Sequence, residues 1–346
     1  MSDATTRGLT FIGAGQYDEL APAFDFIPNT LQDSSVAIIY GPPQSGKTFF
    51  ALHLLCSTAL GRPVFGLQPE KRRGLYIGLE GEAGIKARIM AWCAENGAKK
   101  SPIHYALGSF DIADEDQRAD LIEYIREHEI QFVVIDTLAR TMTGLDEIAG
   151  KDMSLVIDAL HEIKAETGAC IVAIAHTGKD VSAGIRGHSS QLGNVDTTIE
   201  LDSAAPPSEA LTHTTPRRAR VRKQRDGETG TQFYFRLARH ETPLRNARGE
   251  PVCSVAVSDC EAFKDWEAQQ ARTADAAKFT DREREALDVL ADMTRLTGSP
   301  SIDQLRRTLK RRGWADTLAP AAWRKAFQRL ADKLDLDSNG SIEYAR

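Results

Sequence analysis

An eight-residue glycine-rich turn constrains this chain more than any other feature of the sequence. The turn fits the pattern G-x-x-x-x-G-K-[ST] at every position, follows the apolar run 36–40 and precedes a helix-like apolar segment at 49–55. Its residues are Gly41, Pro42, Pro43, Gln44, Ser45, Gly46, Lys47 and Thr48. In a strand-turn-helix setting, the backbone N–H groups of such a turn converge on phosphate oxygens. The sequence therefore predicts a nucleotide site; the alternative is a Gly/Pro turn that contains Gly-Lys-Thr without this role.

Two side chains of the turn have separate expected roles. A lysine at the position of Lys47 reaches the β- and γ-phosphates of the nucleotide. The hydroxyl of Thr48 is placed to bind Mg²⁺, which bridges the same phosphate oxygens. We therefore expect ATP and Mg²⁺ as cofactors.

Patterns typical of buried strands alternate with helical patterns after the turn. Apolar runs at 74–79, 130–135 and 170–175 have the length of strands buried on both faces, and segments with helical spacing separate them. This order predicts an α/β fold, a doubly wound and mostly parallel sheet with its ligand at the carboxyl ends of the strands. Alternating residues between 219 and 237 predict a β-hairpin that closes the sheet.

Each of these three apolar runs ends in a polar residue. Asp136 suits the outer shell of the metal, with a helix N-cap as the alternative, and Glu80 suits the base that activates a water molecule. Glu82 is a rival for that base. His176 is a candidate sensor of the γ-phosphate, although a lone histidine is more often structural.

The tail of the chain predicts a second domain. We expect a flexible arm at 1–20, an ATPase core at 21–245, a linker at 246–279 and a small domain at 280–346. Three helical patterns and an Asn-Gly hairpin signal in that small domain favour a winged helix, a variant of the helix-turn-helix. Its third helix carries Arg324 and Lys325, which favour duplex DNA as a partner; a solvated basic face is the alternative.

Charge and composition set limits on partners and location. The net charge of −6 divides into +2 for 280–346, with 13 Lys/Arg against 11 Asp/Glu, and −8 for the rest. A polyanion must therefore be bound locally. The five cysteines form no C-x-x-C pair, so we assign them no metal and no disulfide. No run reaches the roughly 18 apolar residues of a membrane span, so we expect a cytoplasmic protein without a membrane partner.

The motifs together resemble the RecA-type core and, more narrowly, the RepA-like family of plasmid replicative helicases. The resemblance covers about residues 20–240, with markers at 40–48, 75–81, 133–137, 175–179 and 186–190. It implies phosphate and metal roles for Lys47 and Thr48, and the base, metal-shell and sensor roles for Glu80, Asp136 and His176. It also implies that the loop around Arg186 faces the channel of a ring. With Lys179 in the same loop, Arg186 is our candidate contact to single-stranded DNA.

A further motif resembles the Lys-Gln-Arg motif of DnaB-type replicative helicases. It spans 223–230, and the resemblance implies that Arg225 is an arginine finger for a neighbouring subunit, with Lys223 as its companion. The alternative is a charged hairpin tip. The chain departs from the RepA-like pattern in two respects: no arginine follows Val195 and Asp196 where that family has its finger, and a C-terminal domain is added.

These observations predict an ATP-hydrolysing, ring-forming motor on single-stranded DNA. We expect a homo-oligomer, a hexamer, in the replication of a plasmid, phage or integrated element. The alternative is a DNA-binding regulatory or assembly ATPase that does not unwind DNA. A metabolic kinase is disfavoured, because a kinase excludes water whereas a carboxylate at Glu80 would activate it.

Overall fold

The computed structural model describes most of the first 260 residues and parts of the C-terminal segment. The described residues are 24–146, 149–176, 191–203, 212–213, 215–259, 283, 286, 288–290, 292–293, 300–313 and 320–331. The chain divides into two compact units, Met1–Cys260 and Glu261–Arg346. The expected arm at 1–20 and the expected DNA contacts Lys179 and Arg186 lie outside the described residues.

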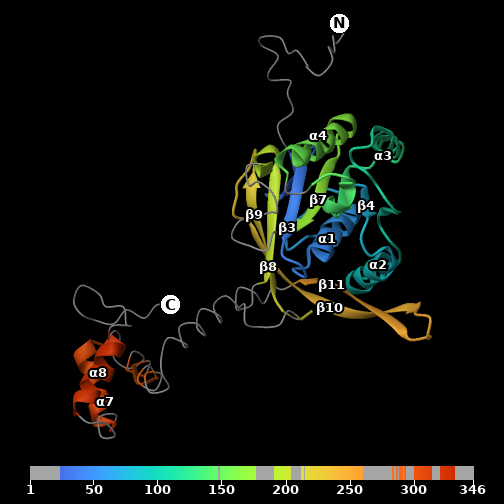
Figure 1. Cartoon of the computed structure of the whole chain (residues 1–346). Coiled ribbons are helices and arrows are strands. Elements are labelled where there is room, and N and C mark those ends of the chain that lie inside the picture. The colour runs from blue at the N-terminus through green and yellow to red at the C-terminus, as the bar shows by residue number, and fades with distance from the viewer. Residues whose placement is uncertain are drawn as a thin grey trace, which may run out of the picture. The chain divides into compact units, whose positions relative to one another are not determined.

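Within the described residues of the first unit, nine strands form one sheet (Figure 1). Their order across the sheet is β11-β10-β9-β8-β3-β7-β6-β4-β5. Their bounds are β3 Val36–Gly41, β4 Gly74–Gly78, β5 His104–Leu107, β6 Phe132–Asp136, β7 Cys170–His176, β8 Thr197–Ser203, β9 Arg217–Gln224, β10 Gln232–Arg245 and β11 Pro251–Asp259. A small antiparallel pair, β1 Asp25–Ile27 and β2 Leu31–Gln32, precedes them.

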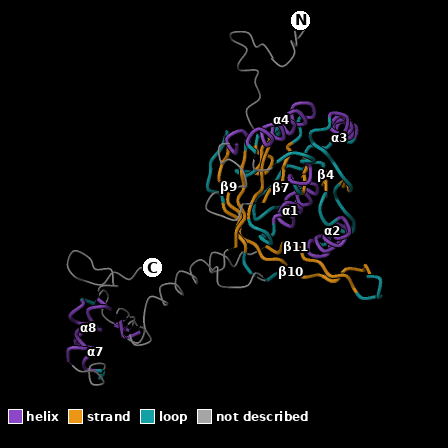
Figure 2. The backbone as a smooth tube through the Cα atoms, in the orientation of Figure 1, coloured by secondary structure: helices purple, strands orange, loops and turns teal. Residues whose placement is uncertain are grey.

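The sheet is parallel from β8 to β5 and antiparallel from β9 to β11. Strands β3, β4 and β6 are buried along their whole length, as the continuous apolar runs predict. The predicted hairpin is formed by β9 and β10. The later part of β10 pairs with β11, and these two strands extend beyond the rest of the sheet (Figure 2). The predicted α/β class with a mostly parallel central sheet is confirmed.

In the described part of the first unit, four α-helices cover the two faces of the sheet. They are α1 Lys47–Leu60, α2 Glu82–Asn96, α3 Glu115–Glu127 and α4 Gly150–Thr167. Helices α1 and α2 pack with one set of buried strand residues, and α3 and α4 pack with the other. Gly61 and Gly97 end α1 and α2 in the left-handed conformation, as their positions after the apolar patterns predict.

The parallel register aligns the ends of the central strands. Gly41 at the end of β3 lies opposite His176 at the end of β7, and Gly78 at the end of β4 lies opposite Asp136 at the end of β6. The residues that follow or end these strands therefore meet at one edge of the sheet. This edge is where a doubly wound sheet binds its ligand.

The structure corrects the expected core boundary at residue 245. Strand β11 pairs with β10 over Pro251–Asp259, so the sheet continues into the segment where a linker was expected, and the first unit ends at Cys260. Strand β5 was also not predicted from the sequence. Both are edge strands of the sheet, where one side of the backbone has no strand partner and apolar patterning is weak.

The described part of the second unit contains two complete helices, α7 Ile302–Arg311 and α8 Pro320–Ala331. Ser301 and Gln304 form a capping box at the start of α7. Leu305 and Leu309 of α7 pack with Phe327 and Leu330 of α8 in a small core of their own. The winged-helix assignment stays a prediction, because the expected hairpin after residue 331 lies outside the described residues.

A search of the described helices for one long and apolar enough to cross a bilayer finds none.

Candidate nucleotide site

The phosphate loop lies between β3 and α1, and its two terminal glycines are required by close packing. A Cβ atom on Gly41 would lie 2.1 Å from the carbonyl oxygen of Leu201. Gly46 has a φ of 91°, and a Cβ atom there would lie 2.8 Å from Cδ of Arg217. No side chain caps the start of α1, so its first N–H groups face the loop. Such a helix start favours an anion.

Lys47 is the buried cation of the loop. Its Nζ donates hydrogen bonds to the carbonyl oxygens of Gly41 (2.8 Å) and Pro42 (2.9 Å). Burial lowers the pKa of Lys47 to about 8, and the nearby carboxylates of Asp136 and Glu80 oppose that fall. An anion in the loop would oppose it further, because a nearby negative charge favours the protonated amine.

Asp136 joins the phosphate loop to the centre of the sheet. Its Oδ2 accepts hydrogen bonds from Oγ1 of Thr48 (2.7 Å) and from the hydroxyl of Tyr76 (2.5 Å), and the residue is 2% exposed. Burial raises the pKa of Asp136, and the hydrogen bonds from Tyr76 and Thr48 oppose the rise. The hydroxyl and the carboxylate thus lie together, as the predicted metal roles of Thr48 and Asp136 require.

Glu80 lies two residues after β4, at the rim of the same edge. Its Oε1 accepts hydrogen bonds from Oγ1 of Thr137 (3.1 Å) and from Nε of Arg140 (3.3 Å). The carboxylate is 40% exposed, so water can reach it. Two donors on one oxygen fix its orientation without enclosing it, which is suitable for a base that acts on water.

A pocket of about 320 Å³ unites most of the predicted residues. Lys47, Thr48, Glu80, Asp136 and His176 all line it, with Gln44 and Gly46 of the phosphate loop. Its other lining residues are Phe49, Thr137, Ile174, Thr212, His213, Arg217 and Leu237. The structure therefore brings together on one chain the groups that the sequence predicts for phosphates, metal, base and sensor. They fit ATP with Mg²⁺: a cation and helix start for phosphate, and a hydroxyl beside a carboxylate for the metal.

Arg225 and Lys223 are not among the described residues that line this pocket. Nη1 of Arg225 lies 2.8 Å from Oδ1 of Asp196, and Lys223 donates to the carbonyl oxygens of Gly193 and Val195. The side chain of Arg225 is 48% exposed. The two residues are thus held at the end of β9, away from the phosphates of their own chain.

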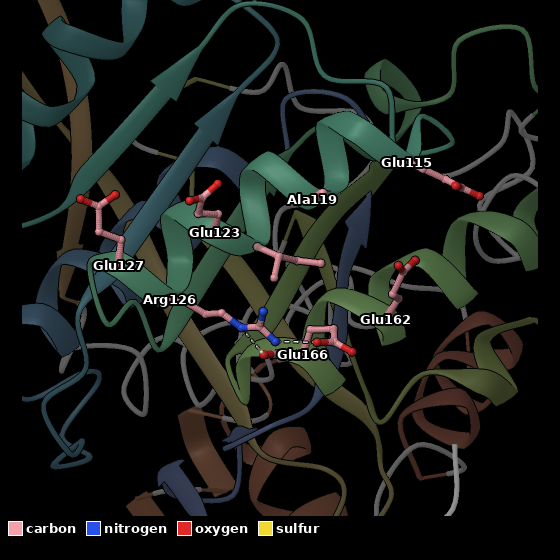
Figure 3. Close-up of a pocket in the computed structure, with 8 residues that line it drawn as sticks. Glu115, Ala119, Glu123, Arg126, Glu127, Glu162 and Glu166 are labelled. Atoms are coloured by element: carbon pink, nitrogen blue, oxygen red, sulfur yellow. Dashed lines mark hydrogen bonds and ion pairs between the residues drawn. The ribbon is translucent and has the colours of Figure 1, made fainter. Parts of the chain in front are cut away.

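A larger cavity, of about 570 Å³, lies between α3 and α4 (Figure 3). Its charged lining is mostly acidic, and its one arginine, Arg126, pairs with Glu166. The acidic residues are Glu115, Glu123, Glu127, Glu162 and Glu166. Because like charges repel, this cavity does not suit a nucleotide or a nucleic acid. The smaller pocket at the strand ends is the candidate site.

Comparison with protein families matches the AAA domain model to residues 8–182. The chain belongs to the AAA domain family. Membership means a nucleotide-dependent ATPase, in agreement with the phosphate loop and the residues around it. No curated protein sequence matches the chain. Among solved structures, the RadB recombinase is similar, with 16% identity, a TM-score of 0.42 and coverage of 60% of this chain and 89% of that one.

Three residues around the site of this AAA domain protein were not predicted from the sequence. Tyr76 lies within an apolar strand and looks like an ordinary core residue, and Arg140 is a single arginine four residues after Asp136. Arg217 begins β9 and is 4% exposed. Tyr76 lies two residues before Gly78, the last residue of β4, and period two places the two residues on one face of the strand, which was the available signal.

We expect Tyr76→Phe to weaken Mg²⁺ binding, so that hydrolysis needs a higher Mg²⁺ concentration. The substitution removes one of two hydrogen bonds that hold Oδ2 of Asp136. Loss of such a supporting partner typically reduces metal affinity or activity by about 10–100-fold. The measurement is the Mg²⁺ concentration that gives half-maximal ATPase rate. Tyr105→Phe, on the neighbouring strand and 55% exposed, is the control; an equal change in both variants would contradict a role through Asp136.

Proposed function

We propose that the chain is an ATP-hydrolysing, ring-forming motor that acts on single-stranded DNA. A replicative helicase of a plasmid, phage or integrated element is the function that the site supports best. One observation carries the proposal: the pocket gathers Lys47, Thr48, Glu80, Asp136 and His176 from a single chain, whereas Arg225 lies outside it. A site that lacks its arginine finger is completed by a neighbouring subunit.

Within this proposal each residue has a defined task. The backbone of the phosphate loop and Lys47 bind the β- and γ-phosphates, while Thr48 and Asp136 hold Mg²⁺ directly and through its shell. Bound Mg²⁺ neutralises charge on the phosphate oxygens. Glu80 orients and deprotonates water, and His176, at the end of β7, contacts the γ-phosphate side of the pocket.

The contact between Glu80 and Arg140 supports a link from the base to the DNA-binding surface. Arg140 belongs to the short 3-10 helix Leu138–Thr141, and we propose that the loop after this helix also faces the channel of the ring. Its Nε lies 3.3 Å from the carboxylate of Glu80. A nucleic-acid phosphate that attracts this guanidinium would change the position of the base. Hydrolysis is therefore expected to respond to single-stranded DNA.

The C-terminal unit supplies a second proposed contact, to duplex DNA. In α7 the basic side chains are exposed while Leu305 and Leu309 are buried. These side chains are Arg306, Arg307, Lys310 and Arg311. Arg324 and Lys325 lie on α8, and Lys325 is exposed. A basic face on two adjacent helices favours a polyanion.

The alternative is a regulatory or assembly ATPase that binds DNA without unwinding it. The ATPase rate with and without single-stranded DNA, measured beside strand displacement on a forked duplex, separates the two. A motor is expected to show both DNA-stimulated hydrolysis and displacement. Stimulated hydrolysis without displacement favours the alternative, and a monomer that ignores single-stranded DNA contradicts the ring motor.

Glu80→Gln is expected to abolish hydrolysis and to leave ATP binding intact. Removal of a general base costs about 10²–10⁴-fold in rate, while the amide keeps the shape of the side chain. Glu82→Gln is the matched comparison, because Glu82 is the rival carboxylate. The measurements are steady-state phosphate release and the Kd for ATP. If Glu82→Gln released phosphate slowly while Glu80→Gln released it at the normal rate, Glu82 rather than Glu80 would be the base that activates water.

Mixing two inactive variants tests whether Arg225 acts on a neighbour. In a mixture of Lys47→Ala and Arg225→Ala subunits, some interfaces pair an intact Lys47 with an intact Arg225. The ATPase rate of the mixture should therefore exceed the sum of the separate rates. A mixture of Lys47→Ala and Glu80→Gln is the control, because both changes disable the pocket within one chain. No gain in the first mixture would contradict a finger that acts between subunits.

A further inference from the structure

Arg217 is a buried guanidinium whose hydrogen-bond partners among the described residues are all main-chain carbonyl groups. Nη1 donates to the carbonyl oxygens of Thr215 (2.7 Å) and His213 (3.3 Å), and Nη2 donates to that of Thr212 (3.0 Å). A guanidinium has five N–H groups, so two remain after these bonds. Nε is buried and has no hydrogen-bond partner among the described residues.

Other arginines of the chain use the same edge of the guanidinium to bind a carboxylate. Nε and Nη2 of Arg72 donate to the two oxygens of Asp33, at 3.0 and 2.7 Å. Nε and Nη2 of Arg218 donate likewise to Asp202, at 3.1 and 2.8 Å. Arg217 forms no ion pair with any carboxylate in the described part of the chain. Since a buried cation without a counter-charge is costly, its edge is suited to an anion supplied from outside.

The position of Arg217 identifies where that anion would lie. Arg217 lines the pocket with Gly46, Lys47 and Thr48, and its Cδ would be 2.8 Å from a Cβ atom on Gly46. Lys47, the residue after Gly46, shows the same arrangement, as a buried cation whose Nζ donates to the carbonyl groups of Gly41 and Pro42. In the described part of the chain, both cations thus donate their hydrogen bonds to main-chain oxygens, and both lie beside Gly46 of the phosphate loop.

The geometry points to Arg217 as a second phosphate-binding residue, which contacts the phosphate chain of the bound nucleotide from its own subunit. The inference rests on nucleotide binding by the phosphate loop, and it is independent of the proposed DNA motor. It differs in kind from the role of Arg225, because Arg217 needs no neighbouring chain. Two of its carbonyl partners, Thr212 and His213, line the same pocket, so the residue also ties them to the nucleotide.

A purely structural clamp is the competing explanation, and Arg217→Met separates the two. Methionine keeps an unbranched apolar stem beside Gly46 but removes the charge and every donor. The probes are ADP and inorganic pyrophosphate, each measured by competition with a fluorescent ADP analogue. Arg218→Met is the control, because Arg218 is the next residue of β9 and pairs with Asp202 outside the pocket.

The expected result is a loss of affinity of about tenfold or more for both ADP and pyrophosphate, with no fall in the melting temperature of the ligand-free protein. Arg217→Lys should recover part of that affinity, since it restores the charge. Unchanged ADP affinity, or a loss matched by a lower melting temperature, would overturn the inference. So would weaker ADP binding with unchanged pyrophosphate binding, which would place the contact at the base. Failure of the wild-type chain to bind ADP would instead refute nucleotide binding itself.

Discussion

The hydrogen bonds at Oδ2 of Asp136 connect every part of the site to the fold. Thr48 from the start of α1 and Tyr76 from the middle of β4 both donate to this oxygen at the end of β6. The hydrogen bond from Thr48 joins the phosphate loop to β6. The loop follows β3, and β7 lies between β3 and β6, so the bond positions the loop against a strand that β3 does not contact directly. The parallel register sets the level at which these groups meet, because β4, β6, β7 and β3 all end at one edge.

Two positively charged side chains at the same edge of the sheet, Lys47 and Arg217, have their hydrogen bonds to main-chain carbonyl groups rather than to carboxylates. Lys47 and Arg217 are buried, and burial lowers the pKa of each. Main-chain carbonyl groups take up their donors but supply no negative charge. Asp136 and Glu80 supply negative charge near Lys47, but Arg217 pairs with no carboxylate among the described residues. A nucleotide phosphate would add negative charge beside both cations, in a partly enclosed pocket where an electrostatic interaction is stronger than in water. Part of the binding free energy of a nucleotide would therefore come from the interaction of its phosphates with Lys47 and Arg217.

The central strands and the phosphate site could be predicted from the sequence because local patterns determine them. Continuous apolar runs mark β3, β6 and β7, and a polar residue at the end of a parallel strand must lie at the ligand edge. Strands β5 and β11 were missed because edge strands are partly exposed and carry weaker patterns. Tyr76 and Arg217 were missed for a different reason. Their roles depend on which side chains from distant segments lie beside them, and neither a tyrosine in a strand nor an arginine in a polar segment indicates such a partner.

The pairing of Arg225 with Asp196 bears on whether a neighbouring subunit could use this arginine. The side chain of Arg225 is 48% exposed, whereas the carboxylate of Asp196 is 9% exposed, so solvent screens the ion pair from the arginine side only. Asp196 also accepts a hydrogen bond from the backbone N–H of Val36, at 2.9 Å, and keeps that partner if Arg225 moves. An arginine finger raises the rate about 10³–10⁵-fold, which corresponds to about 4–7 kcal/mol of transition-state stabilisation. In the proposed assembly, a gain of that size would offset the loss of this ion pair, so the contact with Asp196 is compatible with a role of Arg225 at a neighbouring subunit.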